Sequence, residues 1–209
     1  MALVSGTGFI LRLDPISEKD LAVSILTRGR GVVRGVVRGA RGNARKASAL
    51  QLLTEVSVTI YRREGADLAR FDSIEIVRSA FHLAARAETA MLLPYLAEHL
   101  LTFVPDSDPG EEIYRLTRHV LDALSEGADA DLAARYFEVW LLRFAGLLPD
   151  PEGIPQAARD VVAAVQRSPL PRVPEFPQEA LREAEAFCRD LRREFLGHEL
   201  KSYRFLGLT

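Results

Sequence analysis

The residues best suited to chemistry in this sequence are a series of guanidinium groups, rather than an acid–base pair or a nucleophile. Between Leu21 and Thr54 the chain carries seven basic side chains and no acidic one. These basic residues are Arg28, Arg30, Arg34, Arg38, Arg41, Arg45 and Lys46. Concentrated positive charge attracts polyanions, and nucleic acid is the commonest large polyanion in a cell. The pattern therefore predicts a nucleic-acid-binding segment; the alternative is a solvated surface on which the charges cluster by chance.

The spacing of these residues favours contact with a phosphate backbone. The segment Arg28–Lys46 reads RGRGVVRGVVRGARGNARK, in which GVVR occurs twice in tandem. If Val32–Arg38 is a strand, Arg34 and Arg38 share one face about 13 Å apart, at ~3.3 Å per residue. None of the 19 positions is aromatic. Because base stacking needs aromatic rings, we expect the segment to hold phosphates and to read little sequence.

Two details of this region are open to more than one interpretation. Tyr61 and Phe71 are candidates for a nearby stacking surface, although packing in the core or at its rim is the better interpretation of each. After Arg38, the sequence GARGNARK is typical of a mobile loop.

Other kinds of site are not indicated by the sequence. Cys188 is the single cysteine, and the four histidines form neither an HExxH motif nor an i, i+4 pair. The glycines match neither GxxxxGK[ST] nor a GxGxxG that opens a helix. The acidic pairs Glu111–Glu112 and Glu183–Glu185 lie on helical patterns, and we interpret them as solvated faces. We therefore predict no catalytic residue, no metal ligand and no cofactor.

Composition and charge divide the chain into two parts. The whole chain has a net charge of −2, of which residues 1–80 carry +5 and residues 81–209 carry −7. We predict a nucleic-acid-binding domain at 1–80 and a helical domain for scaffolding and protein docking at 81–209. The N-terminus lacks a positively charged leader region, and no apolar run is long enough to cross a membrane. The predicted compartment is the cytoplasm.

Hydrophobic periodicity supports the same division. Residues 1–80 contain five segments with strand-like alternation, at Phe9–Asp14, Leu21–Thr27, Val32–Arg38, Leu52–Tyr61 and Phe71–Arg78. So few strands leave open edges unless they close into a small barrel. Residues 81–209 carry helical stripes that we interpret as core, and they are Leu93–Phe103, Ile113–Leu124, Leu132–Leu148 and Leu181–Phe195. Pro94 suggests a break or kink in the first stripe, and Cys188 is expected to be buried.

The order of these features resembles the RecO family of bacterial recombination mediators. The resembling segments cover about four-fifths of the chain and read LAVSILTRGRG, VVRGARGNARKASALQLLTEVSVTIYRREGADLARF, FEVWLLRFAGLLP and GHELKSYRFL. The resemblance implies an α+β fold, with an N-terminal five-stranded oligonucleotide/oligosaccharide-binding (OB) barrel followed by an all-helical C-terminal domain. Many members carry a four-cysteine zinc element after the central helix. Asp150–Val161 lacks those cysteines, so zinc is not expected here.

The same resemblance implies a non-enzymatic role in DNA repair and recombination. Such proteins bind single- and double-stranded DNA, anneal complementary strands and help to load RecA. They also bind RecR and the acidic C-terminal tail of the single-stranded DNA-binding protein (SSB). Carried over to this chain, the DNA-binding role falls on Arg34, Arg38, Arg41, Arg45 and Lys46, whereas Arg28 and Arg30 are added by charge alone. Arg115, Arg118 and Arg143 are candidates for the basic rim that an SSB tail requires.

Two other functions share the same basic segment. An RNA-binding OB module would distinguish RNA from DNA through the 2′-hydroxyl group. A protein-docking scaffold would use the arginines to hold an acidic partner and would bind nucleic acid poorly.

Overall fold

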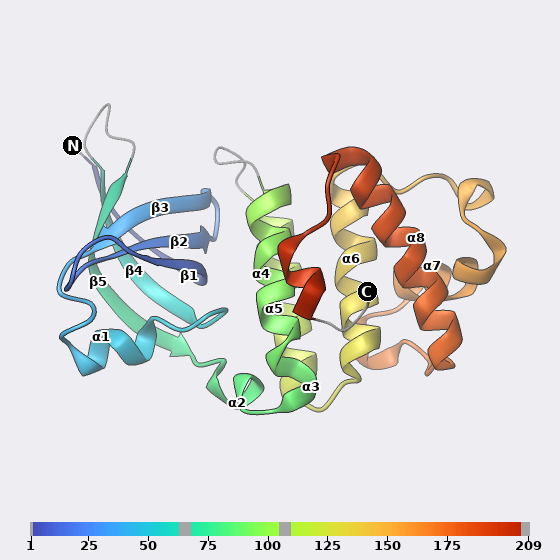
Figure 1. Ribbon diagram of the computed structural model, residues 1–209, viewed down its shortest axis with the longest axis horizontal. Helices are drawn as coiled ribbons and strands as arrows, with labels where there is room; N and C mark the ends of the chain where they lie inside the picture. Colours follow the sequence, from blue (N-terminus) through green and yellow to red (C-terminus); the bar gives the residue numbers. More distant parts are fainter. Residues whose placement is uncertain (1, 63–67, 105–109, 206–209) are drawn as a thin grey trace. The chain divides into compact units, whose positions relative to one another are not determined.

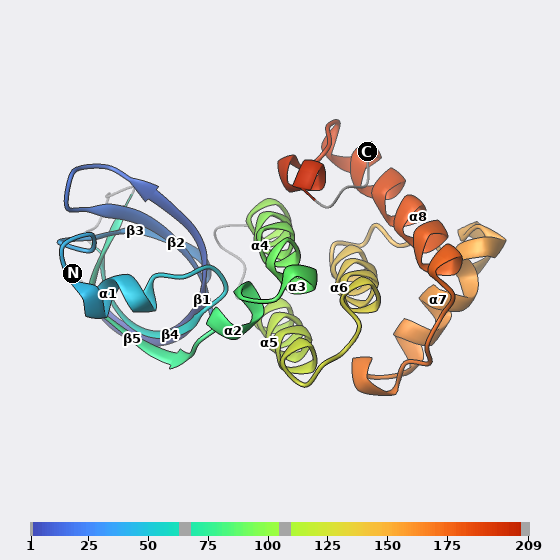
Figure 2. The same cartoon turned by 60° about the horizontal axis from the view of Figure 1, so that its bottom comes forward.

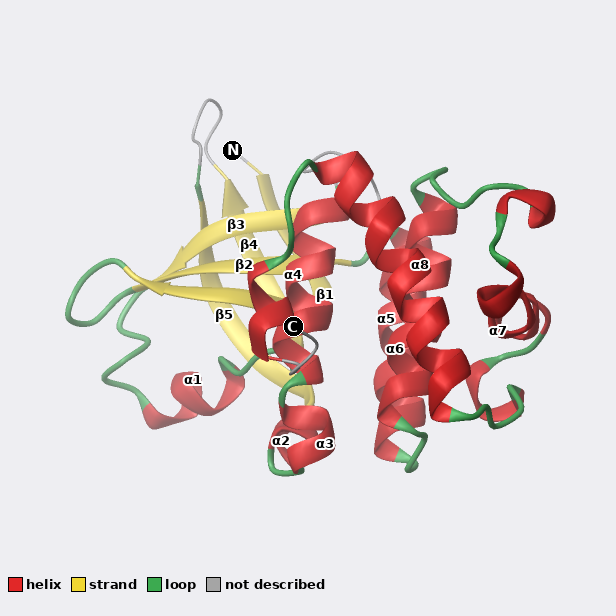
Figure 3. Ribbon diagram, turned by 45° about the vertical axis from the view of Figure 1, so that its right-hand side comes forward, coloured by secondary structure: helices red, strands yellow, loops and turns green. Residues whose placement is uncertain are grey.

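The computed structural model describes residues 2–62, 68–104 and 110–205 of the chain. The strands are β1 (Ala2–Pro15), β2 (Leu21–Thr27), β3 (Gly31–Val37), β4 (Glu55–Arg62) and β5 (Ala69–Arg78). The α-helices are α1 (Ala44–Ala49), α2 (Phe81–Ala84), α3 (Ala87–Ala90), α4 (Leu92–Phe103), α5 (Glu111–Ser125), α6 (Ala130–Phe144), α7 (Gln156–Arg167) and α8 (Gln178–Leu196). Short 3-10 helices are η1 (Pro151–Gly153), η2 (Leu170–Arg172) and η3 (Lys201–Phe205). Of the described helices, α1 alone precedes the last strand (Figures 1 and 3).

The five strands close into a barrel in the order β1-β2-β3-β5-β4. Neighbouring strands are antiparallel except for β3 and β5, which run parallel and pair over Gly35–Ala69 and Val36–Arg70. Closure removes the unpaired strand edges that an open five-stranded sheet would expose. The predicted fold class is confirmed: a five-stranded OB-like barrel is followed by helices.

Apolar side chains from all five strands fill the barrel. The members of this core are Ile10, Val23, Ile25, Val37, Ala40, Ala49, Leu50, Val56, Val58, Ile60, Ala69, Phe71 and Ile74. Helix α1 contributes Ala49 and contacts β5, next to the barrel core (Figure 2). Phe71 lies in this core with 3% of its surface exposed, which confirms its interpretation as a packing residue.

The predicted strands differ from the observed ones at two irregular positions. A register shift between Ile10 and Arg12 makes a bulge in β1, so the predicted alternation of Phe9 and Leu11 with Ile10 is wrong. All three side chains are buried, with Ile10 in the barrel core. The segment before β4 is a turn rather than the predicted strand start, because Leu53 has a positive φ of 55°. The Leu53 amide donates to the carbonyl of Ile10 at 2.7 Å, which ties this turn to the bulge.

Helix α1 replaces part of the predicted loop after Arg38. Asn43 is the N-cap residue, and its side chain accepts a hydrogen bond from the amide of Lys46. The prediction of a loop through Lys46 is therefore wrong for the last three residues, because the Asn43 side chain caps a helix that begins at Ala44. Residues 39–43 form turns, as expected.

The predicted helical stripes correspond to α4, α5, α6 and α8. Pro94 lies in the first turn of α4, where its missing amide hydrogen has no partner to lose, and the helix is interrupted just before it, at Met91 between α3 and α4. Phe144 and Phe195 are 37% and 57% exposed. The interpretation of the stripe residues as core is therefore wrong for these two side chains. Helix α7 was not predicted, although Ala158, Val161 and Val165 give it a buried face. Cys188 is fully buried, as expected.

The chain folds into two compact units, Met1–Tyr114 and Arg115–Thr209. The strands end at Arg78, close to the predicted boundary between residues 80 and 81, but α2, α3 and α4 belong to the unit that contains the barrel. The division into domains at 80 and 81 stays a prediction about which parts fold independently. We call the second unit, Arg115–Thr209, the helical unit. Within it, α6, α7 and α8 contact one another pairwise. Each helix in the described parts of the chain is too short or too polar to cross a lipid bilayer.

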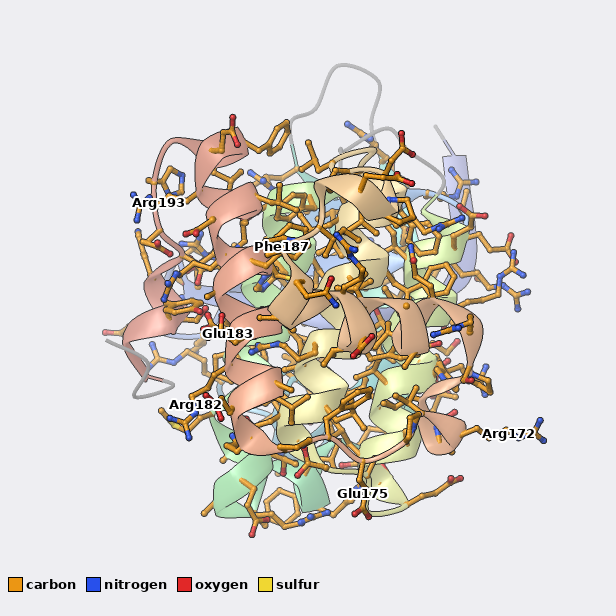
Figure 4. All side chains as sticks on the ribbon, turned by 90° about the vertical axis from the view of Figure 1, so that its right-hand side faces the viewer. Arg172, Glu175, Arg182, Glu183, Phe187 and Arg193 are labelled. Carbon is orange, nitrogen blue, oxygen red and sulfur yellow. The ribbon has the colours of Figure 1, made fainter. Side chains whose placement is uncertain are left out.

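Four charged side chains are buried together between α6 and α8. Glu138 lies 2.7 Å from Arg135 Nε and 3.3 Å from Arg192 NH1, and each of the three side chains is at most 5% exposed. Burial raises the pKa of Glu138 to about 8, an effect that Arg192 opposes. Glu185 is the fourth member and is 5% exposed, so interpreting it as part of a solvated face was wrong. Its neighbour Glu183 is exposed, as predicted, and is labelled in Figure 4.

His119 joins α5 to the connector that contains η2. Its Nε2 accepts a hydrogen bond from the amide of Leu170 at 3.1 Å, so the ring is neutral there. The pKa of His119 is lowered from 6.5, mainly by burial and against the opposing charge of Glu126. Protonation would put a second N–H group against the Leu170 amide and remove this bond.

Replacing Gly35 should destabilise the barrel at its parallel seam. A Cβ atom at Gly35 would lie 2.8 Å from the Ala69 carbonyl oxygen and 2.9 Å from the Phe71 ring, whereas a Cβ at Gly42 meets nothing within 4 Å. We expect Gly35→Ala to lower the free energy of unfolding by about 1–3 kcal/mol, as overpacked sites do, and Gly42→Ala to leave it nearly unchanged. Urea denaturation followed by circular dichroism measures both. Equal stability of the two variants would contradict the assigned β3–β5 register.

Removing the charge of Glu138 should weaken the helical unit strongly above about pH 8, where its carboxylate is ionised. Glu138→Gln leaves Arg135 and Arg192 buried without their shared carboxylate, so we expect a loss of about 3–5 kcal/mol in the free energy of unfolding. The exposed Glu183→Gln is the matched control, and its effect should stay within about 0.5 kcal/mol. Thermal unfolding by calorimetry compares the two. A Glu138→Gln variant as stable as the control would show that the cluster is not closed to water.

The stability of the helical unit should fall in mildly acidic solution because of His119. Since its pKa is lower in the folded state than the unfolded value of 6.5, the unfolded chain binds more protons below that pH. The contribution of neutral His119 to the free energy of unfolding is therefore fully present above pH 6.5. It is lost as the pH falls through the lowered pKa of the folded state. His119→Gln keeps an acceptor for Leu170 and should flatten this dependence, whereas His198→Gln should not. The measurement is the unfolding midpoint between pH 7.5 and about 5, and parallel curves for all three proteins would contradict the assignment.

Candidate nucleic-acid interface

The predicted basic residues lie in strand β3, in the turns on either side of it and in helix α1. Arg28 and Arg30 lie in the turn before β3, Arg34 lies in its middle, and Arg38 directly follows its last residue. Arg41 lies in the next turn, and Arg45 and Lys46 belong to α1. The side chain of Arg45 lies outside the described residues, and Lys46 is half-buried. The remaining five arginine side chains are exposed.

The β2–β3 hairpin places Arg28 and Arg30 at its tip. Gly29 and Gly31 have φ values of 86° and 61°, which residues with a side chain rarely adopt. Thr27 Oγ1 donates to the carbonyl of Gly31 at 2.9 Å and closes the turn. The hairpin pairs Ser24 opposite Arg34. These two glycines therefore build the turn that presents the first two arginines.

The alternation of β3 directs Arg34 away from the barrel core. Val37 belongs to that core, Val33 packs against it, and Gly35 approaches the ring of Phe71 from the same side. Arg34 must then lie on the outer face, because successive side chains of a strand point to opposite sides. In OB barrels the outer face of strands 2 and 3 is the surface that binds oligonucleotides. Arg38, four residues along, is about 13 Å from Arg34 at ~3.3 Å per residue.

The basic residues differ in what they bind within the protein. Arg30, Arg34 and Arg38 form no ion pair with any acidic residue in the described part of the chain. Arg28 pairs with Glu111 at 3.1 Å. Lys46 Nζ donates to the carbonyl of Arg38 at 2.8 Å, so it also holds the turn after β3. Three arginines are thus available to an external anion without breaking a described ion pair.

The loop between β1 and β2 docks against the turn after β3. Asp20 Oδ1 accepts a hydrogen bond from the amide of Gly39 at 2.8 Å, and the amide of Arg41 donates to the carbonyl of Lys19 at 3.1 Å. The guanidinium of Arg41 also lies 3.4 Å from the carbonyl of Ser17. Lys19 is exposed and joins the candidate interface, although sequence reasoning did not select it. No local signal identifies it, because strand pairing brings it to Arg41.

Aromatic stacking surfaces are not prominent in this interface. Phe71 is buried, and Arg70 lies over the ring of Tyr61 with its Cζ 5.3 Å from the ring centre. Tyr61 is therefore covered by a cation on one face, which agrees with its interpretation as a rim residue. Within the described residues no cluster of three or more His, Cys, Asp or Glu side chains is arranged to hold a metal ion. The interface can neutralise phosphates, which requires charge but no metal or stacked base.

Comparison with known proteins finds two adjoining family matches. Residues 1–80 match the model described as Recombination protein O N terminal, and residues 85–153 match Recombination protein O C terminal. The first match ends two residues after β5, and the second ends at the last residue of η1.

Individual relatives carry the same description. The chain is 34% identical over 149 residues to the DNA repair protein RecO of Koribacter versatilis (strain Ellin345), covering 71% of this chain and 61% of that protein. It is 37% identical over 150 residues to the DNA repair protein RecO of Anaeromyxobacter sp. (strain K), covering 71% and 59%. The corresponding protein of Gloeobacter violaceus is 32% identical over 147 residues. The chain thus spans about three-fifths of the length of the first two relatives.

Proposed function

We propose, from the premise that the chain belongs to the RecO family, that it acts in DNA repair and recombination as a mediator rather than as an enzyme. In this proposal the barrel binds single- and double-stranded DNA through Arg28, Arg30, Arg34, Arg38, Arg41, Arg45 and Lys46. The bound protein anneals complementary strands and assists the loading of RecA on SSB-coated DNA. Its compartment is then the cytoplasm, at the nucleoid.

The observation that carries the proposal is the row of exposed arginines along β3. Arg30, Arg34 and Arg38 recur every four residues and are exposed, and none forms a described ion pair. At about 13 Å along the extended chain, and with ~3.4 Å of axis per phosphate in one strand of a duplex, Arg34 and Arg38 would contact phosphates roughly four nucleotides apart. Contacts of this kind are independent of base sequence, which suits a protein that must act on any broken DNA.

Annealing follows from the same charges. Two complementary strands repel each other through their phosphates, and arginines that neutralise some of these charges lower the barrier to pairing. Because the interface has no prominent stacking surface, the bases of a bound strand would remain available to a second strand. Strand pairing would then need no chemical step and no cofactor.

The helical region is proposed to contact proteins, among them RecR and the C-terminal tail of SSB. An acidic tail with an apolar end requires a cation beside an exposed apolar surface. Of the arginines selected by sequence, Arg143 best fits that requirement: its Cζ lies 5.6 Å from the ring centre of Trp140, which in turn is 5.6 Å from that of Phe144. Phe144 is 37% exposed. The other two candidates, Arg115 and Arg118, are exposed on α5.

Reversing the charge of two arginines on β3 should weaken DNA binding for all sequences alike. Each phosphate contact contributes about 0.7 to the slope of log affinity against log salt for single strands, so Arg34→Glu/Arg38→Glu should flatten the slope by about 1.4. Affinity should fall roughly tenfold per lost contact. Fluorescence anisotropy with labelled oligo-dT and a matched duplex across a salt series measures both quantities.

The control is Arg172→Glu/Arg182→Glu, which makes the same charge change at two exposed positions in the helical unit, labelled in Figure 4. It should leave both slope and affinity close to those of the unmodified protein. A β3 variant that binds as well as this control would rule out the assigned interface. Tighter binding of matched RNA than of DNA would instead favour an RNA-binding module.

A further inference from the structure

Arg28 is the one predicted DNA-binding arginine that pairs with a carboxylate within the described residues. Its NH2 group donates to Glu111 Oε1 at 3.1 Å, and the two side chains are 57% and 44% exposed. A carboxylate and a phosphate present the same charged oxygens to a guanidinium group, so they compete for the same donors. Whatever binds Arg28 from outside must therefore displace Glu111 or share the guanidinium with it.

The position of Glu111 next to Arg28 is built by the surrounding structure. Thr7 links the backbone of Arg28 to α5: its carbonyl accepts a hydrogen bond from the Arg28 amide at 2.9 Å, and its Oγ1 lies 3.0 Å from Tyr114 Oη. Tyr114 is three residues after Glu111 in α5, and its hydroxyl donates to the buried carboxylate of Glu55 at 2.6 Å. The first turn of α5 is thereby fastened to the barrel, with Glu111 within reach of Arg28.

Aromatic packing strengthens the same attachment. The ring of Tyr114 lies 4.8 Å from that of Phe9, and both residues are at most 2% exposed. Because this part of α5 is held by a buried ring and a buried hydrogen bond, the Glu111 carboxylate stays close to Arg28 when no ligand is present. An exposed ion pair between two mobile side chains would lack this constraint.

We propose that Glu111 is an internal competitor for nucleic-acid phosphate at Arg28, and that it limits the affinity of the barrel for DNA. This inference rests on the proposed function. In the free protein the Glu111 carboxylate is paired with the guanidinium group of Arg28, which is the first basic residue of the segment Arg28–Lys46. A phosphate that takes its place releases Glu111, so DNA binding exchanges an internal ion pair for an external one.

The competition acts in both directions. If the Arg28–Glu111 pair lowers DNA affinity, DNA must by linkage weaken that pair by the same factor. The first turn of α5 then keeps its attachment through Tyr114 and Glu55 but loses the attachment through Arg28. The barrel surface and the start of α5 are thus coupled through a single guanidinium group.

The test compares two neutralising substitutions in the same helical turn. Glu111→Gln removes the carboxylate beside Arg28, whereas Glu112→Gln removes the same charge from the adjacent, exposed position. Both lie in the first turn of α5, so their effects on helix stability and on overall charge are matched. Affinity for a labelled oligo-dT is measured by anisotropy at about 50 mM salt, where electrostatic differences are largest.

We expect Glu111→Gln to bind about twofold to fivefold more tightly than Glu112→Gln, the range that an exposed ion pair allows. In an Arg28→Ala background the two glutamine variants should bind equally, because the guanidinium for which Glu111 competes is absent. Equal affinities of the two variants in the presence of Arg28 would overturn the inference. If the unmodified protein fails to bind DNA even at low salt, the proposed function itself fails, and the two failures are thereby distinguished.

Discussion

The barrel depends on a steric constraint at its parallel seam, where β3 meets β5. Gly35 faces the Ala69 carbonyl and the Phe71 ring at distances that leave no room for a Cβ atom. This close approach allows the sheet to close, and closure sets the register of β3. In an open sheet a one-residue slip of β3 would turn Arg34 toward the core and its valines toward solvent. The outward position of the central arginine therefore follows from a glycine on the opposite face of the same strand.

The basic residues along β3 have two kinds of role. Arg30, Arg34 and Arg38 project from the barrel without a described ion pair, whereas Arg41 donates to a backbone carbonyl of the β1–β2 loop and Lys46 to one of the turn after β3. Cations of the second kind hold the loops in the positions from which the first kind reach solvent. The number of basic residues in the segment is therefore larger than the number that can bind an external polyanion without losing an internal contact. The position of each residue relative to β3 decides to which group it belongs.

Charge is also used inside the helical unit, with a different physical consequence. Helices α6 and α8 each contribute one arginine and one glutamate to the buried cluster. Burying these groups is unfavourable unless each finds a partner, and the partners lie on the other helix as well as on the same one. We interpret the cluster as a device that selects one packing of α6 against α8, since any other register would leave a buried charge unpaired.

The sequence by itself determined the α+β class, four of the five strand positions to within a few residues, the main helical stripes and the basic segment. Each of these depends on local composition or on periodicity, which the sequence records directly. The tertiary structure alone decided the bulge at Leu11, the turn at Leu53, the burial of Glu185 and the pairing of Arg28 with Glu111. Those features arise from contacts between residues far apart in the chain or from the packing of one element on another. A pattern read along one segment contains no information about them, because the same local sequence is compatible with several partners.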